Sequence, residues 1–182
     1  MTPADQLTVA RALAMPVVVL LFAVSFAHHN YWGTAVFCVA MATDWFDGRI
    51  ARATGRTSPL GTLLDPVADK LLVLATLIVL LDQRVFPAWM VALIVARELL
   101  VSGLRLAALE RGVVIAARDL GKLKTWSQAI AAAVGGLAAA GVWRHDVAWW
   151  TLLVALALTW ISGLDYARVA PRLLRQTAAT AP

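Results

Sequence analysis

Four aspartates in an otherwise apolar stretch of chain are the residues best suited to chemistry. They are Asp44 and Asp47, near the end of one hydrophobic segment, and Asp65 and Asp69, at the start of the next. Ionised carboxylates are costly at membrane depth, so acids within apolar segments usually belong to a functional site. Divalent cations bound between the carboxylates would hold four negative charges together at the lowest cost. The four residues therefore predict metal-assisted chemistry at a membrane surface.

The spacing of the aspartates predicts that their carboxylates converge. On helices, Asp44 and Asp47 are three residues apart and Asp65 and Asp69 are four apart, so each pair projects from one helix face. A short turn at residues 58–61 would make the two helices antiparallel neighbours. All four carboxylates would then share one small volume, as a site for two metal ions requires.

The residues between the aspartates fit a site for a phosphate-bearing ligand. Gly48 costs a helix about 1 kcal/mol relative to alanine, and close approach by a ligand is one reason for such a glycine. Ala51 keeps the same face shallow, and Arg52 offers a planar donor fork for phosphate. Structural alternatives exist. Asp65 before Pro66 suits a helix N-cap and first turn, Gly48 suits helix packing, and the charges suit a solvated interfacial cluster.

Composition and hydrophobic segments predict the elements that position these residues. Of the 182 residues 61% are hydrophobic and 15% charged, whereas soluble domains carry about 25% charged residues. A membrane-spanning helix needs about 20 apolar residues. Hydrophobic segments run over residues 10–27, 31–53, 65–81, 86–108, 122–142 and 147–168. We therefore expect an all-α integral membrane protein with six transmembrane helices in a single domain over residues 1–175, followed by a loose tail over 176–182. The first segment reads as a retained helix rather than a cleaved signal peptide.

The basic residues indicate orientation in a membrane and not nucleic-acid binding. The net charge is +5, and the bases lie in short loops between apolar segments. Only Arg84 and Arg144 are expected on one side, and Arg97 lies within a segment, so the other bases gather on the opposite side. That side should be cytoplasmic and should hold both termini, the second and fourth loops, and the aspartates. The single cysteine, Cys38, excludes a disulfide framework and reads as a small buried hydrophobe.

The second half of the chain predicts a pocket for an anionic molecule. Arg97 lies within the fourth apolar segment, and Arg105, eight residues later, shares its helix face. The next loop on the cytoplasmic side brings Lys122 and Lys124. An intramembrane arginine near further bases suits an anionic acceptor. Alternatively, Arg97 pairs with Glu98, and the lysines meet anionic lipid headgroups.

The stretch from residue 44 to 69 resembles the signature of the CDP-alcohol phosphatidyltransferase family, D-x2-D-G-x2-A-R-x8-G-x3-D-x3-D. Every spacing of that signature is kept at Asp44, Asp47, Gly48, Ala51, Arg52, Gly61, Asp65 and Asp69. The resemblance implies a six-helix membrane enzyme that moves a phosphatidyl group from a CDP-linked lipid to an alcohol and releases CMP.

The resemblance also implies roles for the matched residues. The metal residues, for one or two Mg²⁺ or Mn²⁺ ions, would be Asp44, Asp47, Asp65 and Asp69. Asp69 would in addition be the general base that accepts the proton of the alcohol. The floor under the cytidine diphosphate would be formed by Gly48, Ala51, Arg52 and Gly61.

Five stretches, residues 5–16, 64–73, 96–105, 121–128 and 162–174, are similar to the phosphatidylglycerophosphate synthases of this family. That similarity implies CDP-diacylglycerol as donor, glycerol 3-phosphate as acceptor, and a homodimer in the cytoplasmic membrane of a bacterium. The acceptor phosphate would be bound by Arg97, Arg105, Lys122 and Lys124. Two alternatives remain open: a sister enzyme that uses inositol phosphate, inositol or serine, and a cation transporter that uses intramembrane acids.

Overall fold

In the computed structural model the backbone is described for residues 3–54, 59–110 and 119–179, and the side chains for residues 13–43, 70–108 and 121–166. Every regular element within these ranges is an α-helix. The helices are α1 (Pro3–Ala23), α2 (His29–Thr54), α3 (Pro59–Asp82), α4 (Ala88–Glu110), α5 (Asp119–Ala139) and α6 (His145–Ala179). The expected all-α class and the six expected helices are thus found in the described chain.

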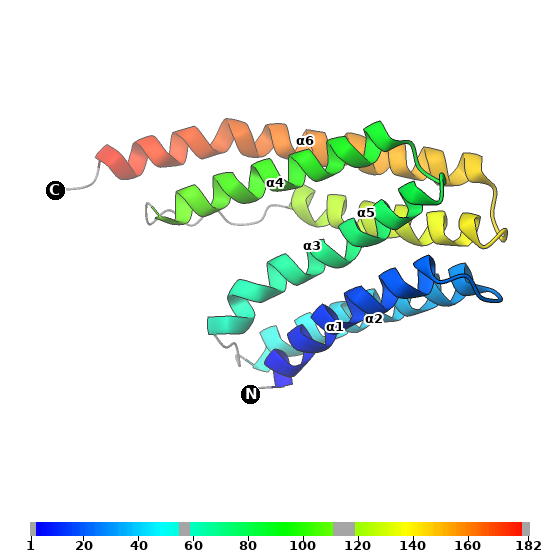
Figure 1. Cartoon of the computed structure of the whole chain (residues 1–182). Coiled ribbons are helices and arrows are strands. Elements are labelled where there is room, and N and C mark those ends of the chain that lie inside the picture. Colours follow the sequence, from blue (N-terminus) through cyan, green and yellow to red (C-terminus); the bar gives the residue numbers. More distant parts are fainter. Residues whose placement is uncertain (1–2, 55–58, 111–118, 180–182) are drawn as a thin grey trace.

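The helices run back and forth between the two ends of an elongated bundle (Figure 1). At one end, here called the motif end, α1, α3 and α5 begin and α2, α4 and α6 finish. At the other, the turn end, residues 24–28, 83–87 and 140–144 join successive helices. The beginning of α1 and the end of α6 therefore lie at the same end of the bundle as the aspartate-bearing stretch, as the distribution of bases predicted.

Helix α3 runs through the middle of the bundle and packs against α1, α4 and α5. On one side of it α1 packs against α2, and on the other α6 packs against α4 and α5, while α2 also reaches α5 (Figure 1). Small residues permit such close approach between helices: a Cβ atom on Gly136 of α5 would overlap the side chain of Thr34 of α2. Every helix contributes to the fully buried apolar core, which includes Val18, Phe37, Leu72, Leu77, Met90, Ile94, Ala131 and Leu152.

Uncharged amide groups tie the helices together at the turn end. Gln83 Nε2, just after α3, donates to the carbonyl of Phe22 at 2.9 Å and to Asn30 Oδ1 at 2.9 Å. Asn30 Nδ2 in turn donates to the carbonyl of Ala139 at 3.0 Å. These four residues form what we call the amide network. It links α1, α2 and α5 to the end of α3.

The beginning of α3 differs from the sequence prediction. The helix starts at Pro59, so Gly61 lies inside it and the turn expected over 58–61 is wrong for residues 59–61; Ser58 is outside the described residues. Proline suits a first helical turn because its fixed φ is helical and its missing N–H needs no partner there. Asp65 and Pro66 then fall well inside α3, which removes the alternative that Asp65 is an N-cap.

Two other expectations are corrected at the level of single residues. Helix α6 continues to Ala179, so residues 176–179 are helical where a loose tail was expected, and residues 180–182 lie outside the described chain. Cys38 is exposed on α2 and not buried.

Within the described residues one helical stretch, His145–Tyr166, is long and apolar enough to cross a membrane, and Leu13–Ala23 is a shorter apolar helix.

Candidate active site

The aspartate motif is divided between two helices, one of which ends and the other begins at the motif end. Helix α2 carries its first half, residues 44–52, in its last turns, and α3 carries its second half, residues 61–69, in its first turns. Only residues 55–58, which are not described, separate the two helices in sequence. The side chains of the whole motif lie outside the described residues: Asp44, Asp47, Gly48, Ala51, Arg52, Gly61, Asp65 and Asp69. Convergence of the four carboxylates therefore stays a prediction.

A buried charged cluster begins at the residue that directly follows the motif. Lys70 Nζ donates to Ser102 Oγ on α4 at 2.7 Å and lies 4.0 Å from Glu98 Oε2. Because consecutive Cα atoms are about 3.8 Å apart, the backbone of this cluster is continuous with that of Asp69. Asp69, the predicted base, and Lys70, a member of the cluster, are thus neighbours in α3.

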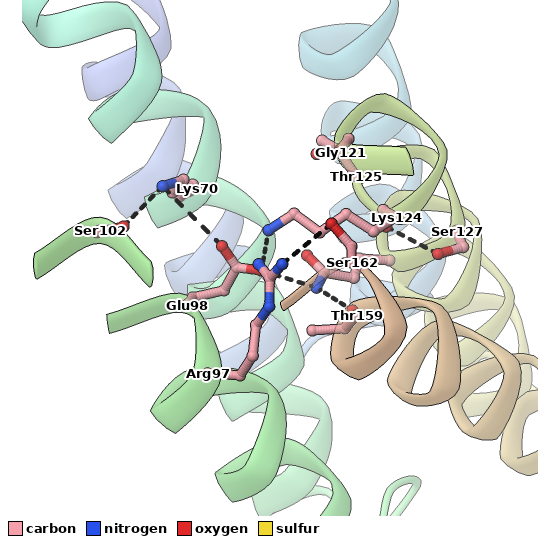
Figure 2. Close-up of polar contacts among 11 residues, drawn as sticks. Lys70, Arg97, Glu98, Ser102, Gly121, Lys124, Thr125, Ser127, Thr159 and Ser162 are labelled. Atoms are coloured by element: carbon pink, nitrogen blue, oxygen red, sulfur yellow. Dashed lines mark hydrogen bonds and ion pairs between the residues drawn. The ribbon is translucent and has the colours of Figure 1, made fainter. Parts of the chain in front are cut away.

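Glu98 on α4 is the hub of the cluster, and its Oε1 atom accepts from three side chains (Figure 2). Arg97 Nη1 donates to it at 3.0 Å, Gln128 Nε2 at 3.2 Å, and Lys124 Nζ is also hydrogen-bonded to it. Lys124 and Gln128 lie one turn apart on α5. We call Lys70, Arg97, Glu98, Lys124 and Gln128 the Glu98 cluster.

Helix α6 closes the cluster on its remaining side. Arg97 Nη2 donates to Ser162 Oγ at 3.1 Å, and Gln128 Nε2 donates to Thr159 Oγ1 at 2.7 Å. The backbone of Gly163 lies so near Arg97 that a Cβ atom there would be 2.9 Å from Arg97 Nε. Four helices, α3 to α6, therefore hold the cluster.

The cluster contains more positive than negative charge. Lys70, Arg97 and Lys124 contribute three positive charges and Glu98 one negative charge, which leaves two positive charges within the cluster. Arg97 and Glu98 are each 3% exposed and Lys124 is 7% exposed. An unbalanced buried charge is costly, and an anion offsets that cost. The Lys70 side chain is 30% exposed, so the cluster reaches solvent at the residue that follows the motif.

Of the four residues predicted to bind an acceptor phosphate, the structure brings two into the cluster. Arg97 and Lys124 are members, and Arg97 pairs with Glu98 as the sequence alternative proposed. Arg105 lies nearby with its guanidinium carbon 5.5 Å from the centre of the Tyr166 ring. Both arginines contact α6, at Ser162 and one turn later, so they share a helix face as their spacing predicts. Lys122 is exposed.

Sequence reasoning did not assign functional roles to Glu98, Lys70 or Gln128. Two signals were available. Glu98 is an acid inside an apolar segment, where an ionisable residue by default belongs to a site. On α5, Lys124 shares a face with Gln128 and Ala132, and both are buried. That face of small and polar residues indicates which of the two predicted lysines of α5 points inward.

Comparison with known proteins places the chain among enzymes of phospholipid synthesis. The sequence profile described as "CDP-alcohol phosphatidyltransferase" matches residues 1–161. A Bacillus subtilis protein named CDP-diacylglycerol–glycerol-3-phosphate 3-phosphatidyltransferase is 50% identical over 99 residues, which are 54% of this chain and 51% of that protein. The match thus spans about half the length of that relative.

Two further relatives match over most of their length. A Mycobacterium tuberculosis protein named probable phosphatidylglycerophosphate synthase is 39% identical over 183 residues, covering 96% of this chain and 86% of that protein. A Shigella flexneri protein with the same name as the Bacillus relative is 35% identical over 164 residues, covering 87% and 85%.

Proposed function

Because the chain belongs to the CDP-alcohol phosphatidyltransferase family, we propose that it transfers the phosphatidyl group of CDP-diacylglycerol to sn-glycerol 3-phosphate. The products are phosphatidylglycerophosphate and CMP. The names of the Bacillus, Mycobacterium and Shigella relatives support this choice of donor and acceptor.

The single observation that carries the choice of an anionic acceptor is the surplus charge of the Glu98 cluster beside Asp69. A phosphate monoester carries about −1.5 to −2 charges at neutral pH, which matches the two positive charges of the cluster. A neutral acceptor such as inositol, or a zwitterion such as serine, would bring no net negative charge to that surplus. Inositol phosphate would satisfy it equally, so the experiment below includes that acceptor.

The reaction is an in-line displacement at phosphorus. The acceptor hydroxyl oxygen forms a bond to the phosphatidyl phosphorus, the bond from that phosphorus to the oxygen of CMP breaks, and the hydroxyl proton passes to Asp69. Positive residues that fix the acceptor phosphate place its hydroxyl close to the base, and such positioning supplies much of the rate enhancement. Arg52 and the small residues Gly48, Ala51 and Gly61 form the floor for the cytidine diphosphate in this proposal.

The donor set of the motif fits a divalent metal. It consists of four carboxylates, Asp44, Asp47, Asp65 and Asp69, and hard oxygen ligands suit Mg²⁺ or Mn²⁺. When bound, one or two such ions would neutralise the pyrophosphate and stabilise the departing CMP. The described side chains contain no cluster of three or more His, Cys, Asp or Glu residues that could hold a metal ion, and these four aspartates lie outside the described side chains.

We also propose that all six helices span the cytoplasmic membrane, with the motif end and both termini in the cytoplasm. Each helix has at least 21 residues, about enough for a bilayer core. Charged residues lower the apolar character of α4 and α5, yet Arg97, Glu98 and Lys124 point into the bundle and not toward lipid. Large apolar side chains of α4 face outward, among them Leu99, Leu100 and Leu104. A homodimer within the bilayer completes this proposal.

Purified protein in lipid nanodiscs tests the activity. CDP-diacylglycerol is supplied with Mg²⁺ and one acceptor at a time: glycerol 3-phosphate, glycerol, inositol 3-phosphate, inositol or serine. We expect CMP release with glycerol 3-phosphate and little with glycerol, which lacks the phosphate. CMP release with inositol phosphate or serine, and none with glycerol 3-phosphate, would replace the proposed acceptor. Ion flux without CMP release in any reaction would support the transporter alternative.

A further inference from the structure

Glu98 is an unexpected residue for a site that binds an anion, because a carboxylate repels phosphate. Yet Glu98 is 3% exposed and contacts or approaches every cation of the cluster. We propose that Glu98 is a positioning residue: it fixes Arg97 and Lys124, with Lys70 alongside, in the arrangement that binds the acceptor phosphate. This inference rests on the proposed function and adds a residue that touches no substrate.

The charges of the cluster favour a positioning role for Glu98. Lys70, Arg97 and Lys124 come from α3, α4 and α5 and converge on one carboxylate. Like charges repel most strongly in a site shielded from water. Without Glu98 the three cationic groups would move apart, and Lys70 could turn toward solvent. The carboxylate therefore makes a compact group of cations possible before the acceptor arrives.

Arg97 and Lys124 do not use all of their N–H donors for hydrogen bonds within the cluster. An ammonium carries three N–H donors and a guanidinium five. Arg97 uses Nη1 for Glu98 and Nη2 for Ser162, and its Nε is buried without a hydrogen-bond partner. Among the described residues Lys124 donates one hydrogen bond, to Glu98, of the three that an ammonium can donate. Glu98 thus orients these cations without exhausting them.

Neighbouring residues of α5 and α6 hold Glu98 and Arg97 in place. Gln128 donates to Glu98 Oε1 and to Thr159 Oγ1, so it restrains the carboxylate from α5 and α6. Gly163 leaves the space that the Arg97 side chain occupies. Such support is typical of sites in which binding groups must be held within a narrow range of positions.

Three variants test the inference by different routes. Glu98→Gln keeps the shape and removes the negative charge. The double variant E98Q/K124M removes one charge of each sign, so Lys70 and Arg97 restore the original surplus of two positive charges. Gly163→Ala adds a methyl group 2.9 Å from Arg97 Nε and changes no charge. Gly103→Ala on α4 is the matched control, since a Cβ there meets nothing within 4 Å.

Two readouts are measured for each variant: the KM of each substrate, and the rise in Tm on adding glycerol 3-phosphate or CDP-diacylglycerol. In E98Q we expect the KM for glycerol 3-phosphate to rise about tenfold or more, while the KM for CDP-diacylglycerol stays within about twofold. The Tm rise with glycerol 3-phosphate should disappear, and the rise with CDP-diacylglycerol should remain. G163A should raise the acceptor KM about threefold, and G103A should leave it unchanged.

The double variant separates positioning from mere stability. E98Q/K124M should regain most of the Tm that E98Q loses, because the charge surplus is restored, but its acceptor KM should exceed that of the single variant K124M, which lacks the same donor and keeps Glu98. Recovery of Tm together with an acceptor KM no higher than that of K124M would show that Glu98 only balances charge, and would overturn the inference. If E98Q does not fold, the double variant and G163A give the decision.

Failure of the proposed function has a different signature. If the wild-type protein shows neither CMP release nor a Tm rise with glycerol 3-phosphate, the acceptor itself is wrong and the inference falls with it. If the wild type shows both, and E98Q and G163A keep the wild-type acceptor KM and Tm rise, the acceptor stands and only the positioning role of Glu98 is overturned.

Discussion

Two polar groups of side chains each link several helices, and they differ in position and in charge. At the turn end the amide network of Gln83 and Asn30 is neutral, and its three hydrogen bonds measure 2.9–3.0 Å. Near the middle of α3 and α4 the Glu98 cluster carries two surplus positive charges, and Arg97 Nε and Glu98 Oε2 are buried without hydrogen-bond partners.

We propose that this difference distinguishes a group that stabilises the fold from a group that binds a ligand. A polar network whose groups are paired makes the packing of helices specific. Surplus charge and unused donors cost stability, and their cost is offset when an anion binds. We therefore expect changes in the motif or in the Glu98 cluster to alter KM or turnover. Changes in the amide network should alter the stability of the fold alone.

The largest expected effect comes from Asp69, at the junction of motif and cluster. Asp69→Asn keeps the size of the side chain but cannot accept the proton of the acceptor hydroxyl. We expect the rate of CMP release to fall by about 10³-fold or more, since general-base catalysis contributes about 10²–10⁴-fold. Binding of CDP-diacylglycerol, measured by the rise in Tm, should remain. Normal turnover of this variant would remove Asp69 from the base role.

Within the Glu98 cluster, the single change Lys124→Met tests whether this group affects acceptor binding in a way that the amide network does not. It removes one buried side chain that we propose donates to the acceptor phosphate. A charge-assisted hydrogen bond contributes about 1.5–3 kcal/mol, so the KM for glycerol 3-phosphate should rise about 10- to 100-fold. Initial rates at varied acceptor and donor measure this. An equal rise in the KM of CDP-diacylglycerol would place Lys124 on the donor side.

Arg105 lies at the edge of the cluster, against Tyr166, so its effect should be smaller. We expect Arg105→Ala to raise the acceptor KM about three- to tenfold and to change the donor KM little. Tyr166→Phe is the matched control, because it keeps the ring beneath the guanidinium. Equal effects of R105A on both substrates would make Arg105 structural.

The smallest kinetic effect is expected at the turn end. Gln83→Ala removes hydrogen bonds to Phe22 and Asn30 and should lower the free energy of unfolding by about 1–2 kcal/mol. The KM of both substrates should stay at the wild-type value. Asp146→Asn, in an exposed ion pair with Arg144, should leave Tm unchanged. A changed acceptor KM in Q83A would contradict the proposed difference in role between the amide network and the Glu98 cluster.

The sequence predicted much of the fold and part of the site. Six apolar segments gave six helices, and the distribution of bases predicted which helix ends lie together. The start of α3 was misplaced because Pro59 and Gly61 are typical of turns, although proline is also favoured in a first helical turn. Lys122 and Lys124 were predicted together, yet residues two apart on a helix lie on nearly opposite faces, and packing against α4 and α6 turned Lys124 inward.

The sequence alone determined the family, through eight motif residues whose identities and spacing can be recognised without knowing how the helices pack. Only the tertiary structure decided that Glu98 is the common partner of Lys70, Arg97 and Lys124. The reason is physical: these residues lie on three helices far apart in the chain, and which side chains share a buried space depends on how the helices pack. The surplus charge of the cluster is a property of that packing.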